Sequence, residues 1–160
     1  MSHNGNGNGK AKAVLLVSPN RELARVLQCL AGPIGLRVRR APSAYAAMAC
    51  IAREQYAGII AEFDLPDVNG CSLLLEVQRR RGFPGALPDC FLLAPSDEKA
   101  AGAGQRLCPA NVVTRPSVTE LAGALRHVAS GSTGGQTERS ERPQQNRAKP
   151  RLQTMIASIN

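Results

Sequence analysis

The sequence predicts an α/β domain in which five parallel strands alternate with five helices, a (βα)5 three-layer sandwich. Short apolar runs of strand length alternate along the chain with longer amphipathic segments. Three of the runs, AVLLV, GIIAEF and CFLLA, are almost continuously apolar, as expected for parallel strands that helices cover on both faces. Strand-helix alternation of this kind implies right-handed crossovers and a functional edge at the carboxyl ends of the strands.

The five predicted strands occupy 13–17, 36–40, 58–63, 90–94 and 111–114. The second, LRVRR, alternates polar and apolar residues, which is typical of an edge strand. In that position Arg37 and Arg39 would face solvent and discourage pairing with another sheet edge.

Helix start signals follow most of these strands. Asn20, Ser43 and Ser96 each precede a helical segment, and their side-chain oxygens can accept from the unpaired amides of a first turn. Ser117 and Glu120 form an S-x-x-E capping box before the last helix of the body.

Composition divides the chain into an arm at 1–12, a periodic body at 13–129 and a polar tail at 130–160. The arm is rich in glycine, so we expect it to be flexible. The tail is too polar and charged to offset the entropy of ordering, so we expect it to be disordered. Its last residues place Leu152, Met155, Ile156 and Ile159 at helical spacing. This stripe is either a docking element for a partner or for the domain itself, or a chance cluster.

The bulk numbers exclude some functions and leave others open. Of 160 residues 43% are hydrophobic and 20% charged, which is typical of a globular protein. Aromatic residues make up only 3%, which disfavours a surface that stacks nucleic-acid bases. The net charge of +8 favours acidic partners, so nucleic acid remains an alternative.

The five cysteines form no CxxC pair and have no histidine nearby, so we expect no metal site and buried, reduced thiols. The N-terminus lacks the apolar stretch of a secretory signal, and no apolar run reaches 18 residues. We therefore expect a cytoplasmic protein without a membrane span.

Two segments carry a family resemblance. AEFDLPDVNG, at 61–70, resembles the turn after the third strand of bacterial response regulator receiver domains, with Pro66 and Gly70 at the family's spacing. VTRPS, at 113–117, resembles the family's Lys-Pro segment. The resemblance covers about residues 12–128. It implies a flavodoxin-like fold with strand order 2-1-3-4-5 and a role in signal transduction.

Phosphoryl transfer to a carboxylate requires a nucleophilic aspartate, a Mg²⁺ ion held by further carboxylates, and positioned donors. Carried over residue by residue, the resemblance finds these positions changed. The acceptor position is Glu62, the metal-ligand positions are Ser18 and Pro19, and the switch positions are Ala94, Val112, Arg115 and Pro116. We therefore predict a pseudo-receiver that needs neither metal nor cofactor, catalyses nothing, and does not depend on phosphorylation.

Three questions stay open at this site. A shifted register would make Asp64 the acceptor, although it lies only two residues before Pro66 and also suits a simple turn role. Glu62 and Arg115 could form a locking ion pair or remain solvated, weakly coupled charges. The resemblance implies a cis bond between Arg115 and Pro116, whereas most X-Pro bonds are trans.

These observations predict a protein-protein interaction module or adaptor in bacterial signalling, with a homodimer also open. The first alternative is a regulator that binds nucleic acid through its basic tail, although no helix-turn-helix segment follows the body. The second is a receiver that retains phosphoryl acceptance at Asp64.

Overall fold

The computed structural model describes residues 11–80, 87–96 and 110–131. Five strands form one parallel sheet in the order β2-β1-β3-β4-β5. The flavodoxin-like order 2-1-3-4-5 is therefore confirmed. The strands are β1 (Lys12–Val17), β2 (Leu36–Ala41), β3 (Gly58–Glu62), β4 (Asp89–Ala94) and β5 (Asn111–Thr114).

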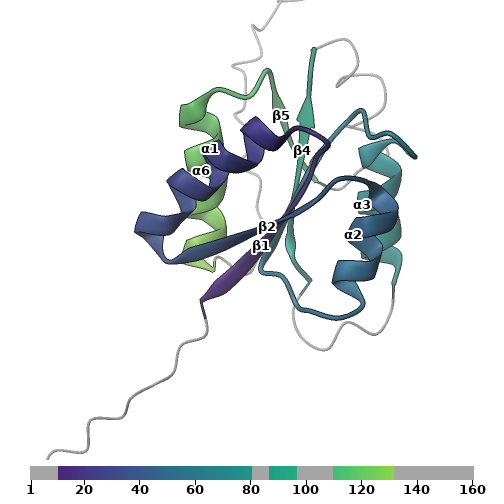
Figure 1. Ribbon diagram of the computed structural model, residues 1–160, viewed down its shortest axis with the longest axis horizontal. Coiled ribbons are helices and arrows are strands. Elements are labelled where there is room, and N and C mark those ends of the chain that lie inside the picture. Colours follow the sequence, from purple (N-terminus) through teal and green to yellow (C-terminus); the bar gives the residue numbers. More distant parts are fainter. Residues whose placement is uncertain (1–10, 81–86, 97–109, 132–160) are drawn as a thin grey trace, which may run out of the picture.

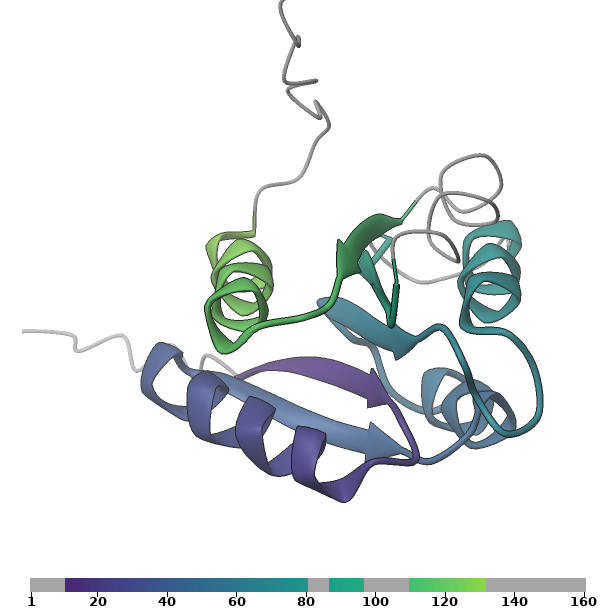
Figure 2. The ribbon, with the colours of Figure 1, turned by 90° about the horizontal axis from the view of Figure 1, so that it is seen from above.

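Helices cover both faces of the sheet, as Figures 1 and 2 show. On one face lie α1 (Arg21–Ala31) and α6 (Val118–Ser130), which contact each other. On the other lie α2 (Ala44–Ile51) and α3 (Gly70–Arg79). A short 3-10 turn, η1 (Gly32–Ile34), joins α1 to β2.

Two apolar cores follow from the two-residue period of the strands. Leu15 and Val17 of β1 pack with α2 and α3, while Val14 and Leu16 pack with α1 and α6. All four are fully buried. Burying a side chain of this size stabilises the fold by about 2 kcal/mol, so the apolar runs serve both layers at once.

The predicted helix starts are confirmed where the structure describes them. Asn20 accepts from the amides of Glu22 and Leu23, and Ser43 accepts from Ala46. Ser117 and Glu120 form the capping box of α6. The cap of α3, Asn69, was not predicted.

Other predictions fall outside the described residues: the helix after Ser96, most of the arm and tail, and the stripe of Leu152, Met155, Ile156 and Ile159. One prediction is wrong. Cys71 and Cys90 are buried, but Cys29 is exposed, because it lies on the outer side of α1. Among the described helices, none is both long and apolar enough to cross a membrane.

Candidate functional site

The carboxyl ends of the strands bring the predicted site residues to one edge of the sheet. Ser18 directly follows β1, and Glu62 is the last residue of β3. Parallel pairing sets Val17 beside Ala61, so the two strands end together. This shared register places the Ser18 and Glu62 side chains within reach of each other.

Ser18 is the polar centre of this edge. Its side chain is fully buried, and its hydroxyl donates to Glu62 Oε1 at 2.8 Å while accepting from the Asn20 amide at 2.9 Å. The Ser18 amide donates to the Ala41 carbonyl at 2.9 Å. A buried polar group is costly unless it is paired, and Ser18 is fully paired by the chain itself.

Arg40 was not singled out from the sequence. It pairs with Leu16 in the β1·β2 register, so its side chain begins beside the turn after β1. Its Nη1 donates to the carbonyl oxygens of Ser18 and Pro19 at 3.0 and 3.2 Å. The sequence did contain a signal for this contact. Neighbouring parallel strands end at the same edge of the sheet, so an arginine near the end of the second strand could have been expected beside the turn after the first.

This arrangement does not fit a Mg²⁺ ion. Mg²⁺ prefers carboxylate and other oxygen ligands in a near-octahedral set. Here the turn after β1 offers a hydroxyl already bonded to Glu62, a proline without a side-chain ligand, and carbonyls that a permanent arginine cation occupies. No described group of three or more His, Cys, Asp or Glu side chains is placed to bind a metal.

Two switch positions lie in β4 and β5: Ala94 is the last residue of β4, and Val112 is the second residue of β5. Ala94 is buried and pairs with Thr114. Val112 is half-buried and packs against the core shared with α2 and α3. Neither side chain has a hydrogen-bonding group, so neither can report a charge at Glu62 through a hydrogen bond.

Of the two alternatives left open for Glu62 and Arg115, the structure does not contain the ion pair. Both residues are described, yet no ion pair joins Arg115 to Glu62, whose carboxylate accepts from Ser18 instead. Arg115 is exposed and has a positive φ of 49°, a left-handed conformation that costs a non-glycine residue about 1–2 kcal/mol. Its amide donates to the Ala94 carbonyl at 2.9 Å, and the bond to Pro116 is trans rather than cis.

The turn between β3 and α3 is tightly built. Asp64 is exposed and bridges to Asn69 across the turn. Gly70 donates its amide to Phe63 at 2.8 Å, and a Cβ on Gly70 would lie 2.0 Å from the Glu62 carbonyl oxygen. Only glycine allows this close approach, which gives the Pro66 to Gly70 spacing a physical reason.

Asp67 connects this turn to α2. Its carboxylate accepts from the Tyr45 amide at 2.8 Å and the Ala44 amide at 3.0 Å, the first two residues of that helix. These bonds lower the pKa of Asp67, with the Tyr45 amide contributing most. The sequence alone did not point to this contact, because the two segments lie more than twenty positions apart.

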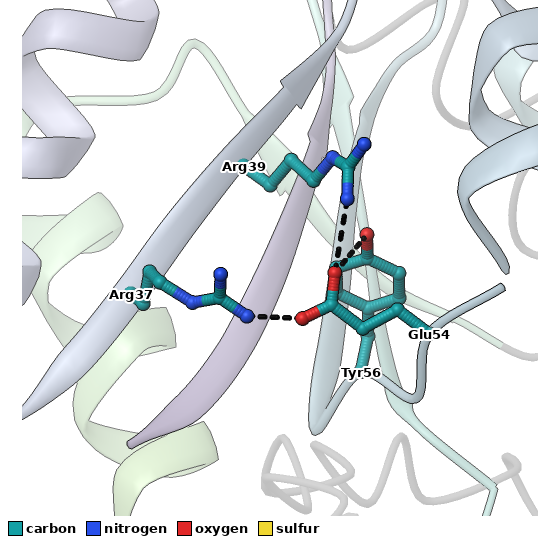
Figure 3. Close-up of polar contacts among 4 residues, drawn as sticks. All are labelled: Arg37, Arg39, Glu54 and Tyr56. Atoms are coloured by element: carbon teal, nitrogen blue, oxygen red, sulfur yellow. Dashed lines mark hydrogen bonds and ion pairs between the residues drawn. The ribbon is translucent and has the colours of Figure 1, made fainter. Parts of the chain in front are cut away.

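A second charged cluster lies on the edge strand β2, shown in Figure 3. Glu54 accepts from Arg37, from Arg39 at 3.0 Å and from the Tyr56 hydroxyl at 3.2 Å. Burial pushes the pKa of Glu54 up, but the hydrogen bonds from Arg39, Tyr56 and Arg37 outweigh it and lower the pKa overall. Burial first, and the Glu54 charge second, raise the pKa of Tyr56 to about 12. Arg37 and Arg39 are thus exposed, as predicted, but they are paired rather than free.

A cavity of about 270 Å³ opens at the same edge as Ser18 and Glu62. It lies between the ends of β3 and β4 and the starts of α1 and α6. Its lining is mainly apolar, with two carboxylates. The lining residues are Leu23, Glu62, Phe63, Asp64, Leu93, Ala94, Pro95 and Pro116.

The strand order and the position of this edge define the α/β fold of CheY-like receiver domains. No family model matches the sequence, and no curated protein matches it. The likeness is structural, and at the sequence identities given below it establishes the fold.

Solved receiver domains superpose over most of their own length. The receiver domain of a histidine kinase from Syntrophus aciditrophicus matches with a TM-score of 0.65 at 19% identity, covering 79% of this chain and 96% of that one. A CheY-like receiver domain from Methylobacillus flagellatus gives 0.62 at 15% identity, covering 73% and 98%. The receiver domain of an HD domain-containing protein from Pseudomonas fluorescens gives 0.60 at 23% identity, covering 76% and 96%.

Proposed function

We propose that this chain is a receiver-fold module that acts in signal transduction by binding a protein partner, without accepting a phosphoryl group. The observation that carries the proposal is the buried Ser18 hydroxyl bonded to Glu62 Oε1 at 2.8 Å. It stands where the resemblance expects a metal-ligating carboxylate next to a nucleophilic one. A hydroxyl that is hydrogen-bonded to a glutamate supplies neither the metal-ligating carboxylate nor the nucleophilic aspartate.

The surroundings of Ser18 support the same proposal. Arg40 places a cation against the carbonyls of Ser18 and Pro19, which would repel a second cation. Ala94 cannot donate a hydrogen bond to a phosphoryl oxygen. With the chemistry of the switch replaced, binding through the outer surface is the function left to the fold.

The test is exposure to a small phosphodonor, acetyl phosphate, with Mg²⁺, followed by intact-protein mass spectrometry. We expect no mass increase of one phosphoryl group, while a receiver that retains its aspartate, treated in parallel, gains one. Asp64→Asn and Glu62→Gln are treated alongside. A phosphoryl adduct on the wild type that Asp64→Asn abolishes would establish the rival acceptor and overturn the proposal.

Partner binding has its own test. The full chain, immobilised, is compared with a form that ends at residue 131, and proteins retained from a bacterial lysate are identified. Capture of a defined partner by both forms assigns binding to the receiver-fold body. Capture by the full chain alone assigns it to 132–160, where the predicted docking stripe lies.

A nucleic-acid partner is the second candidate, and the net charge of +8 is the observation that favours it. Binding of that kind loses affinity steeply with salt, because released counterions dominate it. Affinity for duplex DNA that stays in the micromolar range or tighter at physiological salt would favour this candidate over protein binding.

A further inference from the structure

The cavity at the carboxyl edge of the sheet offers mainly apolar surface. Three of its apolar lining residues are buried: Phe63, Leu93 and Ala94. Three others remain in contact with solvent: Leu23, Pro95 and Pro116. A hollow with an apolar interior that solvent reaches is typical of a site that takes up an apolar group.

The two carboxylates of the lining are already engaged within the chain. Glu62 Oε1 accepts from the Ser18 hydroxyl at 2.8 Å, and Asp64 also has an interaction partner. The binding capacity of the cavity therefore lies in its apolar lining, where an apolar group that displaces water gains free energy.

The volume of the cavity sets the size of the group that fits. About 270 Å³ corresponds to about nine water molecules and so to about nine heavy atoms. A leucine or isoleucine side chain has four carbon atoms, so two such side chains fill the space. Apolar surface continues beside it, because Val118, two positions after Pro116, is 59% exposed. A peptide segment can fill the cavity and cover Val118 at once.

The chain itself contains a segment with apolar side chains at a suitable spacing, outside the described residues. Leu152 and Ile156 stand four positions apart, as do Met155 and Ile159, so each pair lies on one side of a helical turn. Short helical segments bind grooves by inserting side chains at this spacing. So short a helix is not stable alone, and a groove supplies the missing stabilisation.

The direction of α6 and the length of the following chain bring this segment within reach. α6 begins just after Pro116 at the carboxyl edge and ends at the amino edge, where Lys12 Nζ of β1 donates to the Ala129 carbonyl at 3.2 Å. To reach the cavity, the chain after Gly131 travels back along α6, whose 13 residues span about 20 Å. A flexible chain of about 20 residues, the length of 132–151, has a root-mean-square end-to-end distance of about 25 Å.

This match between linker and span favours docking within one molecule. The effective concentration of a tethered group is highest when the mean length of the linker matches the distance, and it is then about millimolar. An affinity too weak to join two separate molecules is therefore sufficient inside one chain.

We propose that residues 152–159 dock into this cavity in the same molecule, with two side chains of the apolar stripe inside it and the others against its rim and Val118. While docked, the segment covers the carboxyl edge of the sheet, including Glu62. The inference goes beyond the proposed function and does not rest on it, since it concerns a contact inside the chain.

Two matched double variants of the ¹⁵N-labelled full chain test the contact by NMR. The stripe variant combines Leu152→Asp and Ile156→Asp, which place two charges in the apolar stripe. The control variant combines Gln153→Asp and Ala157→Asp. It carries the same added charge at the same spacing but leaves the stripe intact.

The amides of the cavity lining report the result. Relative to the wild type, we expect the stripe variant to shift the amides of Leu23, Phe63 and Leu93, and the control variant to leave them unchanged. No difference between the wild type and the stripe variant, or equal shifts in the control, would overturn the proposal. Shifts that disappear when the protein is diluted tenfold would place the segment in a second copy and reject docking within one chain.

A free peptide of residues 147–160 measures occupancy of the cavity. Titrated into the stripe variant, it should shift the same three amides. In the wild type the tethered segment competes, so the apparent affinity should be about tenfold weaker for a dissociation constant of about 0.1 mM. Equal affinity for both forms would show that the wild-type cavity is empty, and no shift in either form would show that the segment does not fit. Both results contradict the proposal.

Leu23→Glu, added to the stripe variant, tests the wall of the cavity. Leu23 is in the first turn of α1, where an acidic residue is favourable, so the helix should persist. A charge on the wall should weaken peptide binding about tenfold, and unchanged binding would place the contact elsewhere. None of these results bears on the phosphodonor test, so failure of this inference and failure of the proposed function are distinguishable.

Discussion

Gly70 shows how one residue fixes the end of the central strand. Its absent Cβ leaves room for the Glu62 carbonyl, which would otherwise lie at 2.0 Å. Gly70→Ala must therefore shift either β3 or the start of α3, and we expect a loss of about 2–3 kcal/mol in the free energy of unfolding. Urea unfolding followed by circular dichroism measures it.

Gly123→Ala is the matched control for that substitution. Nothing lies within 4 Å of a Cβ built on Gly123, which is inside α6. Alanine is favoured over glycine in a helix by about 1 kcal/mol, so this variant should be more stable than the wild type. Equal changes in the two variants would show that helix propensity, not the contact with Glu62, governs Gly70.

At the scale of residues, the sequence identified positions better than contacts. Glu62, Ser18 and Pro19 could be placed because they follow apolar strands, and the strand ends were readable. The hydrogen bond from Ser18 to Glu62 and the bonds from Arg40 to the same turn could not be predicted. They depend on the side-chain conformers that these residues adopt once the sheet edge has formed. Whether Glu62 pairs with Arg115 could not be decided from the sequence either, because no glycine marks the left-handed backbone that Arg115 adopts.

At the scale of elements, Asp67 joins the turn before α3 to the first turn of α2. Two amides and the positive end of the helix dipole favour its ionised form, so the pKa in the folded protein is lower than in the unfolded chain. A carboxyl of this kind stabilises the fold above its unfolded pKa, about 3.9, and the stabilisation is lost as pH falls through the folded pKa.

We therefore expect Asp67→Asn to lower the melting temperature at pH 7, with a difference from the wild type that shrinks as the pH falls below about 4. Thermal unfolding from pH 3 to pH 7 measures the difference. Glu76→Gln, which removes an exposed carboxylate of α3, controls for the loss of one negative charge. A difference that stays constant across this pH range would contradict the role assigned to the ionised form.

The elements themselves were largely predictable, and for local reasons. Caps such as Asn20, Ser43 and Ser117 precede their helices directly in the sequence, and each makes the bond expected of it. Asn69 caps α3 equally well but was missed, because it stands inside a turn already dense in polar residues. Asp67 was missed because its partners lie on another element.

At the scale of the whole molecule, the strand order was implied by the family resemblance, whereas the interior strands were indicated by three apolar runs that had to be covered on both faces. That requirement places β1, β3 and β4 inside the sheet and leaves the alternating β2 at an edge, as observed. The cavity could not be predicted in this way, because it is the space left where two strands end and two helices begin. Its lining joins residues from Leu23 to Pro116.

Part of the positive charge of the molecule is neutralised at the edge strand β2. Glu54 pairs with both Arg37 and Arg39 on β2, which otherwise would present two unpaired cations to solvent. Glu54→Gln should therefore raise affinity for duplex DNA and steepen its dependence on salt by about 0.9–1.8 units of logarithmic slope, one or two added phosphate contacts.

Fluorescence anisotropy with labelled duplex DNA across a range of salt concentrations measures that slope. Glu22→Gln changes the net charge equally but releases only Arg25, an exposed pair on α1. If the two variants gain equal slope, the effect belongs to net charge and β2 has no special role. If Glu54→Gln gains more, the pairing of Glu54 with Arg37 and Arg39 is what limits the affinity of this surface for DNA.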